Sequence, residues 1–255
     1  MKNILVTGGS GKAGRATINL LLKTNYNVFN VDLANHSELD VPFSKVNLEN
    51  FGDAMESVSE IDDRINGIDA IIHQAAIPAP GLETNHKTFR MNTLSTYNIF
   101  QAAKVLKINN IVWASSETVL GLPFDTYPPY VPVDEEYYPR PESSYSLSKV
   151  MGEEMARQYC RRNPEMKIFG LRYSNIMEEN DYKQFQSFQK DPFLRKWNFW
   201  GYIDARDVAQ ACLLAMESKL KGAENFIIAA DDTVMEEDNK SLSLIHISEP
   251  TRPLY

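Results

Sequence analysis

The sequence has little that would cross-link the chain or hold it in a membrane. Only two of its 255 residues are cysteines, Cys160 and Cys212, and neither stands in a metal-ligand spacing or a paired framework. This pattern excludes a disulfide scaffold, predicts no metal site, and indicates two buried core thiols. No run approaches the roughly 18 apolar residues of a membrane span, and the short apolar run after Met1 cannot form a signal peptide. We therefore expect a soluble, cytoplasmic protein that does not bind membranes.

An excess of basic residues is also missing. The chain has 26 Lys and Arg against 34 Asp and Glu, which gives a formal net charge of −8. Without a general basic surface, nucleic acid is not expected as a partner. The 43% hydrophobic content suffices for a sizeable core, so we expect one catalytic α/β unit, with or without a small appendage.

What the sequence does contain is a regular alternation of short apolar runs and longer amphipathic stretches. The apolar runs that predict strands are residues 4–6, 28–31, 70–73, 111–114, 167–171 and 225–229. The stretches that predict helices are residues 13–23, 51–58, 86–107, 143–162 and 208–216. Such alternation is typical of βαβ units. We predict a Rossmann-type α/β fold with a doubly wound parallel sheet, in which a proline-rich loop follows Gly121.

A glycine-rich turn follows the first predicted strand and precedes a helix. In this turn Gly8 permits a tight bend, Gly11 lets the backbone approach a pyrophosphate, and Gly14 allows close packing of the helix. The turn therefore predicts a dinucleotide cradle. Its predicted cofactor-binding residues are Gly8, Gly11, Lys12, Ala13 and Gly14.

The identity of the dinucleotide is indicated by Asp32, which ends the second predicted strand. An acidic side chain at this point accepts hydrogen bonds from the adenine ribose and repels a 2′-phosphate. The prediction is NAD, although NADP is not excluded, because Lys12 and Arg15 lie nearby.

Residues for proton transfer follow further along the chain. Tyr145 and Lys149 are four apart on a predicted helix, so their side chains lie on one face. A nearby ammonium and an oxidised nicotinamide would stabilise the tyrosine phenolate. Ser115 and Ser116 follow an apolar strand, at the carboxyl end where doubly wound sheets bind ligands. A hydroxyl there can hold the substrate oxygen against Tyr145 during hydride transfer.

Together these segments resemble the extended short-chain dehydrogenase/reductases, also called the NAD-dependent epimerase/dehydratase family. The matching segments are residues 7–14, 73–76, 91–93, 115–121, 145–149, 171–175 and 202–209. The resemblance covers residues 2 to about 235 and implies that Ser116, Tyr145 and Lys149 are catalytic, with Lys149 also holding the nicotinamide ribose. It further implies cofactor contacts at Asn47, Ala75, Asn92 and Lys149, and substrate contacts at Ser115, Ser116, Glu117, Tyr145 and Asn175. The aromatic run of residues 197–200 is suited to stacking against a sugar face, so Trp200 is also expected to contact the substrate.

The same resemblance predicts the domain organisation. Residues 1–170 are expected to form the NAD-binding domain with the catalytic residues, and residues 171–235 a small substrate-binding part interleaved with the last strands and helices. Residues 236–255 continue no earlier pattern. From Ser241 onward they resemble translated sequencing adapter, so we expect the genuine chain to be truncated near Asn239 and to lack its natural C-terminus.

Departures from the family pattern bear on the ligands. Many members have an aspartate at the position of Asn47, which here is uncharged. Nucleotide-sugar members carry a long segment before Tyr202 and an arginine that clamps the diphosphate, whereas here the segment is short and Trp200 stands at that place. An indole cannot replace a bidentate guanidinium, which leaves Arg195 and Lys196 as candidates for a phosphate contact. In its compactness the chain resembles uronate dehydrogenases.

We predict an NAD-dependent oxidoreductase that transfers hydride at a hydroxyl or carbonyl carbon of a sugar, a sugar acid or a small polyol. One alternative is a nucleotide-sugar (UDP-sugar) 4-epimerase or dehydratase, for which Glu117 would be a candidate acid. Another is a non-catalytic NAD(P)-sensing protein, which the presence of both Tyr145 and Lys149 disfavours. By resemblance, a homodimer is expected, formed by the helix after His86 and the helix that carries Tyr145.

Overall fold

The computed structural model describes residues 1–59 and 67–246 of the chain. Its main element is a parallel seven-stranded sheet in the order β3-β2-β1-β4-β5-β6-β9, which confirms the predicted Rossmann-type fold. The strands are β1 (Lys2–Thr7), β2 (Tyr26–Asp32), β3 (Phe43–Lys45), β4 (Ala70–His73), β5 (Asn110–Ser116), β6 (Lys167–Tyr173) and β9 (Gly222–Ile228). The direction of winding reverses between β1 and β4, so a crevice is expected beyond their carboxyl ends.

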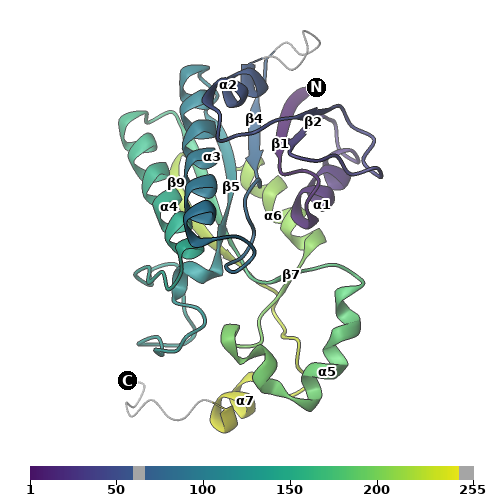
Figure 1. Cartoon of the computed structure of the whole chain (residues 1–255), viewed down its shortest axis with the longest axis vertical. Helices are drawn as coiled ribbons and strands as arrows, with labels where there is room; N and C mark the ends of the chain where they lie inside the picture. The colour runs from purple at the N-terminus through teal and green to yellow at the C-terminus, as the bar shows by residue number, and fades with distance from the viewer. Residues whose placement is uncertain (60–66, 247–255) are drawn as a thin grey trace.

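Helices cover both faces of the sheet (Figure 1). Helices α2 (Phe51–Ser59), α3 (Asn85–Val105) and α4 (Ser144–Arg162) lie on one face, and α1 (Lys12–Leu21) and α6 (Ala205–Glu217) on the other. Because both faces are covered, β4 and β6 are buried along their whole lengths. Two apolar clusters fill the layers, and each contains one of the predicted core thiols, Cys160 of α4 and Cys212 of α6.

Side-chain caps fix the start of α4 and of α6. Ser143 begins α4 in a capping box, in which the backbone N–H of Ser146 donates to Ser143 Oγ at 3.0 Å and the backbone N–H of Ser143 donates to Ser146 Oγ at 2.9 Å. Asp204 caps α6 by accepting the backbone N–H of Arg206 at 2.7 Å. Helix α4 is in contact with β5, and its Lys149 donates to the carbonyl of Ala114 in that strand.

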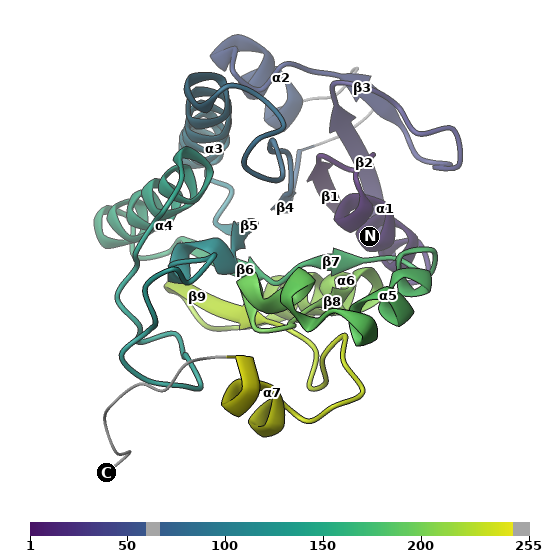
Figure 2. The same ribbon diagram turned by 60° about the horizontal axis from the view of Figure 1, so that its bottom comes forward.

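A smaller unit lies below the main sheet in Figure 1 and in front of it in Figure 2. Its elements are β7 (Ile176–Met177), η2 (Asp181–Gln184), α5 (Phe185–Lys190), η3 (Pro192–Asn198), β8 (Ile203–Asp204) and α7 (Asn239–His246). Phe188, Trp200, Val234 and Leu242 are buried at its centre. Leu242 belongs to the segment predicted to be non-native, and residues 247–255 of that segment lie outside the described residues.

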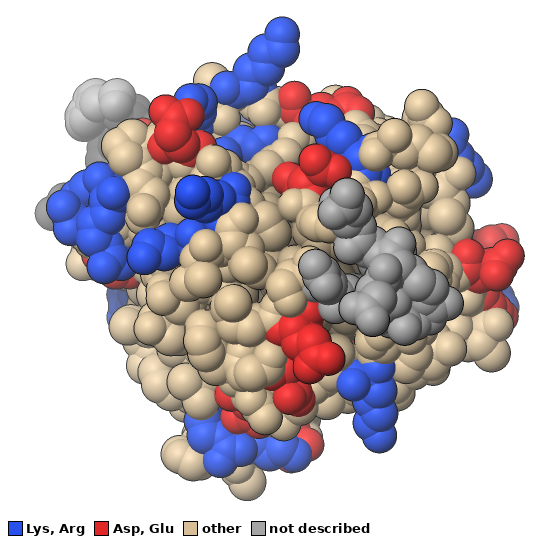
Figure 3. Space-filling model, turned by 90° about the horizontal axis from the view of Figure 1, so that it is seen from above, with Lys and Arg blue, Asp and Glu red and all other residues tan. Residues whose placement is uncertain are grey.

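Charged side chains are dispersed over the surface. Figure 3 shows one face, on which Lys and Arg form several separate groups with Asp and Glu between them. In residues 1–59 and 67–246, no helix combines the length and apolar character needed to cross a bilayer.

Candidate active site

A cavity of about 1040 Å³ opens at the carboxyl ends of the sheet strands. All of the predicted cofactor-binding residues line it: Gly8, Gly11, Lys12, Ala13, Gly14, Asp32, Asn47, Ala75, Asn92 and Lys149. So do most of the predicted substrate-binding residues: Ser115, Ser116, Glu117, Tyr145 and Asn175. Trp200 is the exception. The fold thus gathers segments that are far apart in the sequence around one space.

The glycine turn has the shape that a diphosphate requires. Gly8 has a φ of 70°, and a Cβ atom there would lie 2.5 Å from the backbone nitrogen of Ala75. A Cβ on Gly14 would lie 2.2 Å from the carbonyl oxygen of Gly8, so Gly14 allows the turn to pack on itself. At Gly11 a Cβ would meet only that same oxygen, at 3.5 Å, which leaves its backbone open to the cavity. Gly11 also begins α1 without a side-chain cap, so the first N–H groups of the helix can bind an anion.

Asp32 is held at the end of β2 by the backbone. Its two carboxylate oxygens accept the N–H of Ser10 at 3.0 Å and the N–H of Leu33 at 2.7 Å. A carboxylate has about four acceptor positions, so Asp32 can still accept ribose hydroxyl groups from the cavity side. These residues fit the adenosine half of a dinucleotide.

The opposite wall of the nucleotide region is fixed by Asn92 on α3. The N–H of Ile77 donates to its side-chain oxygen at 2.8 Å, and its side-chain nitrogen donates to the carbonyl of Ile77 at 3.1 Å. Both ends of the Asn92 amide therefore hold the loop after β4 in place. Asn92 lines the cavity, but these hydrogen bonds give it a positioning role in that loop.

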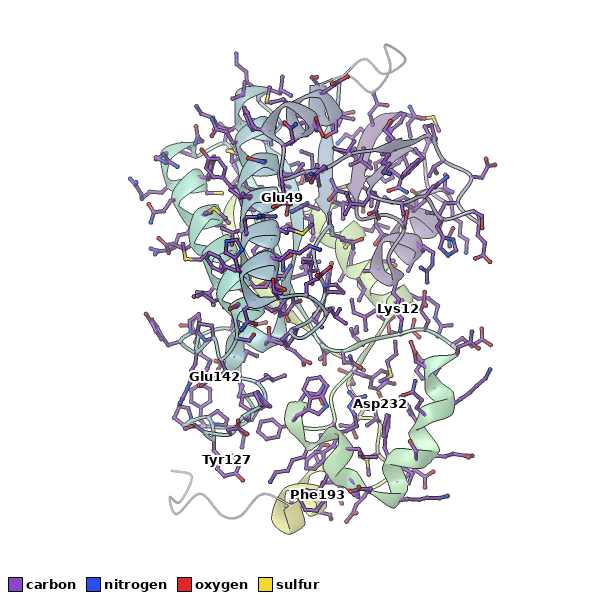
Figure 4. The ribbon with its side chains drawn as sticks, in the orientation of Figure 1. Lys12, Glu49, Tyr127, Glu142, Phe193 and Asp232 are labelled. Atoms are coloured by element: carbon purple, nitrogen blue, oxygen red, sulfur yellow. The ribbon has the colours of Figure 1, made fainter. Side chains whose placement is uncertain are left out.

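Two ion pairs join the glycine turn to the smaller unit. The ammonium of Lys12 lies 2.5 Å from the carboxylate of Asp181, and the guanidinium of Arg15 lies 2.5 Å from the carboxylate of Glu178. In Figure 4, Lys12 accordingly stands between the sheet and the smaller unit. Because Arg15 also donates to the carbonyl of Ser10 at 2.9 Å, both ends of its guanidinium are engaged. It is therefore not directed at a 2′-phosphate beside Asp32.

Tyr145 and Ser116 meet at the other end of the cavity. The hydroxyl of Ser116 accepts hydrogen bonds from the N–H of Thr118 at 3.2 Å and from its hydroxyl at 3.0 Å. This leaves the proton of Ser116 for an oxygen atom in the cavity. Burial raises the pKa of Tyr145 to about 12, although a hydrogen bond with Ser116 lowers it. Burial is the largest influence on this pKa and outweighs the hydrogen bond with Ser116.

Lys149 lies one helical turn from Tyr145 and is buried. Its ammonium donates to the carbonyl of Ala114 at 2.7 Å and stands 5.6 Å from the centre of the Tyr145 ring. Burial lowers the pKa of Lys149 to about 8. The strand-end carbonyl thus fixes the ammonium between β5 and the cavity.

Ser115 is oriented by a buried ion pair that the sequence did not reveal. Its hydroxyl donates to a carboxylate oxygen of Glu153 at 2.7 Å, and the guanidinium of Arg172 donates to both oxygens of that carboxylate at 2.9 Å. Ser115 lines the cavity, but its hydroxyl proton is committed to Glu153. The pair locks β5, α4 and β6 together directly behind the Ser116 site.

Glu117 brings a carboxyl group into the same end of the cavity. The side-chain amide of Asn198 donates to it at 3.2 Å. Burial raises the pKa of Glu117 to about 7, and the favourable contacts with Asn198 and the charge of Arg195 only partly offset this effect. Glu117 is thus an ionisable group that changes charge near neutral pH.

The prediction that Trp200 contacts substrate is wrong in this structure. Phe199 and Trp200 both have positive φ values, 51° and 61°, so the chain reverses after η3. The reversal turns Trp200 into the core of the smaller unit, where its indole N–H donates to the carbonyl of Pro192 at 2.8 Å. Trp197, one helical turn earlier, lines the cavity instead. The aromatic run was visible in the sequence, but which of its rings faces the cavity depends on this reversal.

The two candidate phosphate-binding cations also point elsewhere. Arg195 is buried, donates to the carbonyl of Gly201 at 2.7 Å, and packs on the rings of Phe188 and Trp197. Lys196 stands over the rings of Tyr127 and Phe193. In the part of the chain that the structure describes, neither cation lines the cavity.

The fold and this cavity define a dinucleotide-binding enzyme with a serine, a tyrosine and a lysine at its nicotinamide end. The model of the NAD dependent epimerase/dehydratase family matches residues 4–229. The chain belongs to this family, whose cofactor is NAD.

Three comparisons place the chain within the family. It is 31% identical over 191 residues to a putative UDP-glucose 4-epimerase of Methanocaldococcus jannaschii, covering 72% of this chain but only 57% of that protein. It is 27% identical to an L-arabinose 1-dehydrogenase (NAD(P)(+)) of Haloferax volcanii, covering 91% of this chain and 90% of that protein. The solved structure of a mutated uronate dehydrogenase shares the fold, with a TM-score of 0.70 at 23% identity over 95% of this chain and 79% of that one. The chain thus spans little more than half of the epimerase and nearly all of the arabinose dehydrogenase.

Proposed function

We propose that this protein is an NAD-dependent dehydrogenase of free sugars, which are sugars that carry no nucleotide. The observation that carries the proposal is the absence of an arginine from the cavity wall in the described residues. A nucleoside diphosphate is recognised best by a guanidinium that binds two of its oxygens. Arg195, which stands nearest in the chain to the expected position, is buried outside the cavity lining of the described residues, and one nitrogen of its guanidinium donates to the carbonyl of Gly201. The 27% identity to an L-arabinose 1-dehydrogenase supports the same conclusion.

Ser116, Tyr145 and Lys149 have different roles in the oxidation of an alcohol. When bound, NAD supplies the hydride acceptor and a positive charge beside the phenol of Tyr145. Ser116 donates a hydrogen bond to the substrate oxygen and holds it against Tyr145. Tyr145, as phenolate, takes the proton of the substrate hydroxyl while the C–H bond breaks and its electron pair leaves as hydride. Lys149 provides the fixed positive charge that favours the phenolate.

The experiment is a spectrophotometric assay of NADH formation from NAD with a panel of aldoses, uronates and polyols. We expect NADH formation with at least one member, reduced by about 10²- to 10⁴-fold in Tyr145→Phe, because proton transfer is then lost. A Tyr138→Phe variant, which changes an exposed tyrosine outside the cavity, serves as the matched control. Undiminished activity of Tyr145→Phe would contradict the assignment of the base.

The second candidate is a UDP-sugar 4-epimerase, favoured by the 31% identity to such a protein. An epimerase oxidises and reduces its substrate within one turnover and therefore releases no net NADH. If no free sugar of the panel yields NADH and the protein interconverts UDP-glucose and UDP-galactose, this function replaces the proposed one.

We also propose a homodimer formed through α3 and α4. These helices pack against each other, yet they retain exposed apolar residues, among them Leu94, Tyr97, Leu147 and Met151. An exposed apolar patch of this kind marks a contact surface.

A further inference from the structure

The charges of the cavity wall are unevenly distributed. Its cations within the described residues are Lys12 and Lys149, which belong to the glycine turn and to the Tyr145 helix. Its acids are Asp32, Glu49 and Glu117. Asp32 and Glu49 follow β2 and β3 on the nucleotide side, which leaves Glu117 as the acid beside Ser116, where the substrate reacts.

Glu117 lines the cavity, and its carboxyl group has hydrogen bonds with Ser174, Asn198 and the backbone of Asn175. It begins the short helix η1 directly after Ser116, and the amide of Asn198 donates to one oxygen at 3.2 Å. Arg195 and Tyr145 are the ionisable groups that face it, from η3 and from α4. None of the steps assigned to Ser116, Tyr145 and Lys149 uses this carboxyl, so a buried acid at the reacting end has no role yet.

Arg195 does not cancel the effect of Glu117 on a ligand. Its guanidinium lies behind the wall, between the rings of Phe188 and Trp197, and donates to the carbonyl of Gly201. It is absent from the cavity lining in the described part of the chain. A ligand therefore meets the carboxyl of Glu117 directly and the charge of Arg195 only through the protein.

We propose that Glu117 selects neutral sugars, by accepting hydrogen bonds from their hydroxyl groups and by repelling sugars that carry a carboxylate or a phosphate. This inference rests on the proposed dehydrogenase function and narrows its substrate class. A carboxylate has about four acceptor positions, of which Ser174, Asn198 and the backbone of Asn175 occupy three, so Glu117 can still accept a hydrogen bond from a sugar hydroxyl. Two like charges in a poorly solvated site cost far more than they do in water. Trp197 supplies an aromatic surface at the same end, on which a sugar face can lie.

The selection depends on pH. Because burial raises the pKa of Glu117 to about 7, the side chain is neutral in mildly acidic solution and charged above that pH. A uronate is charged at both pH values. The preference for the neutral sugar is therefore small below pH 6 and grows as the pH rises through 7.

The experiment compares sugars that differ only in charge: D-galactose with D-galacturonate, and D-glucose with D-glucuronate. The measured quantity is the ratio of kcat/KM for the neutral member to that for the acid, between pH 5.5 and 8.5, in the full chain with saturating NAD. The ratio cancels steps common to both sugars. We expect the wild-type ratio to exceed about tenfold at pH 8.5 and to fall as the pH is lowered. In Glu117→Gln, which keeps the shape and loses the charge, we expect a ratio reduced by roughly tenfold and independent of pH.

Two further variants make the result specific. Glu49→Gln removes the charge of the other cavity-lining glutamate and should leave the ratio unchanged. Glu49 is paired with Arg90 of α3 and lies far from Phe193 of η3 in Figure 4. Glu117→Asp keeps the charge and should keep most of the pH dependence. A wild-type preference for the uronate, or equal ratios in wild type and Glu117→Gln, overturns the inference while leaving the dehydrogenase intact. If no free sugar yields NADH and UDP-glucose is epimerised, the proposed function itself fails.

Discussion

The guanidinium of Arg172 and the carboxylate of Glu153 form a two-point ion pair with both distances at 2.9 Å, and both side chains are less than a tenth exposed. Because Ser115 donates to the same carboxylate, the pair couples the interior of the sheet to the end of β5. The residues that face the ligand therefore rest on a charged network in the core.

Breaking this pair should be costly. Removing one partner leaves the other charge buried without compensation, so Arg172→Leu or Glu153→Leu should each lower the free energy of unfolding by about 3–5 kcal/mol. The double variant should lose clearly less than the sum of the two. Urea denaturation measures all three. The exposed pair of Arg157 and Glu154 is the control, and its removal should change stability by less than about 1 kcal/mol.

The buried ammonium of Lys149 should lower the free energy of unfolding at pH 7, although the proposed activity requires it. Its folded-state pKa of about 8 lies below the ordinary 10.5, so the unfolded chain binds more protons between these values and stability rises with pH across them. Lys149→Met removes the buried charge. We expect this variant to be inactive, yet more stable at pH 7 by about 1–2 kcal/mol. Denaturation at pH 7 and at pH 10 tests the sign, because the advantage should shrink at the higher pH.

Ser116 should set the pH dependence of oxidation. Its hydrogen bond lowers the pKa of Tyr145 in the free enzyme, so Ser116→Ala should shift the rising limb of kcat/KM against pH upward. Loss of the hydrogen bond to the substrate oxygen should also reduce kcat by about 10²-fold. The control is Ser115→Ala, since the hydroxyl of Ser115 is committed to Glu153. An unshifted limb in Ser116→Ala would show that Ser116 does not act on Tyr145.

Two glycines of the same turn should respond differently to alanine. At Gly14 the new Cβ would lie 2.2 Å from the Gly8 carbonyl, so Gly14→Ala should destabilise the fold by about 1–3 kcal/mol. At Gly11 the nearest atom is 3.5 Å away, so Gly11→Ala should fold normally and weaken NAD binding by about tenfold. Thermal unfolding and NAD titration separate the two effects.

The proposed dimer should dissociate when its apolar surface is charged. Tyr97→Arg combined with Met151→Arg places two charges on the outer surfaces of α3 and α4, and should convert a dimer into a monomer without unfolding the chain. Sedimentation velocity measures the mass, and circular dichroism provides the control for folding. A wild-type protein that sediments as a monomer at micromolar concentration would exclude this interface.

The alternation of apolar runs with amphipathic stretches was enough to predict the sheet, because strands covered on both faces must be apolar throughout. The sequence also predicted three local features: the glycine turn, Asp32, and the spacing of Tyr145 and Lys149. Each depends on local backbone geometry at the end of one strand or on one face of one helix, which neighbouring residues determine.

The tertiary structure alone decided features that depend on contacts between distant segments. The reversal of the chain at Phe199 and Trp200 turned Trp197 toward the cavity and Trp200 into the core. Burial by residues from several elements raised the pKa of Tyr145 and of Glu117, which no spacing could indicate. Desolvation and side-chain direction are properties of the assembled cavity, whereas the strands, the helices and the glycine turn follow from the order of the residues.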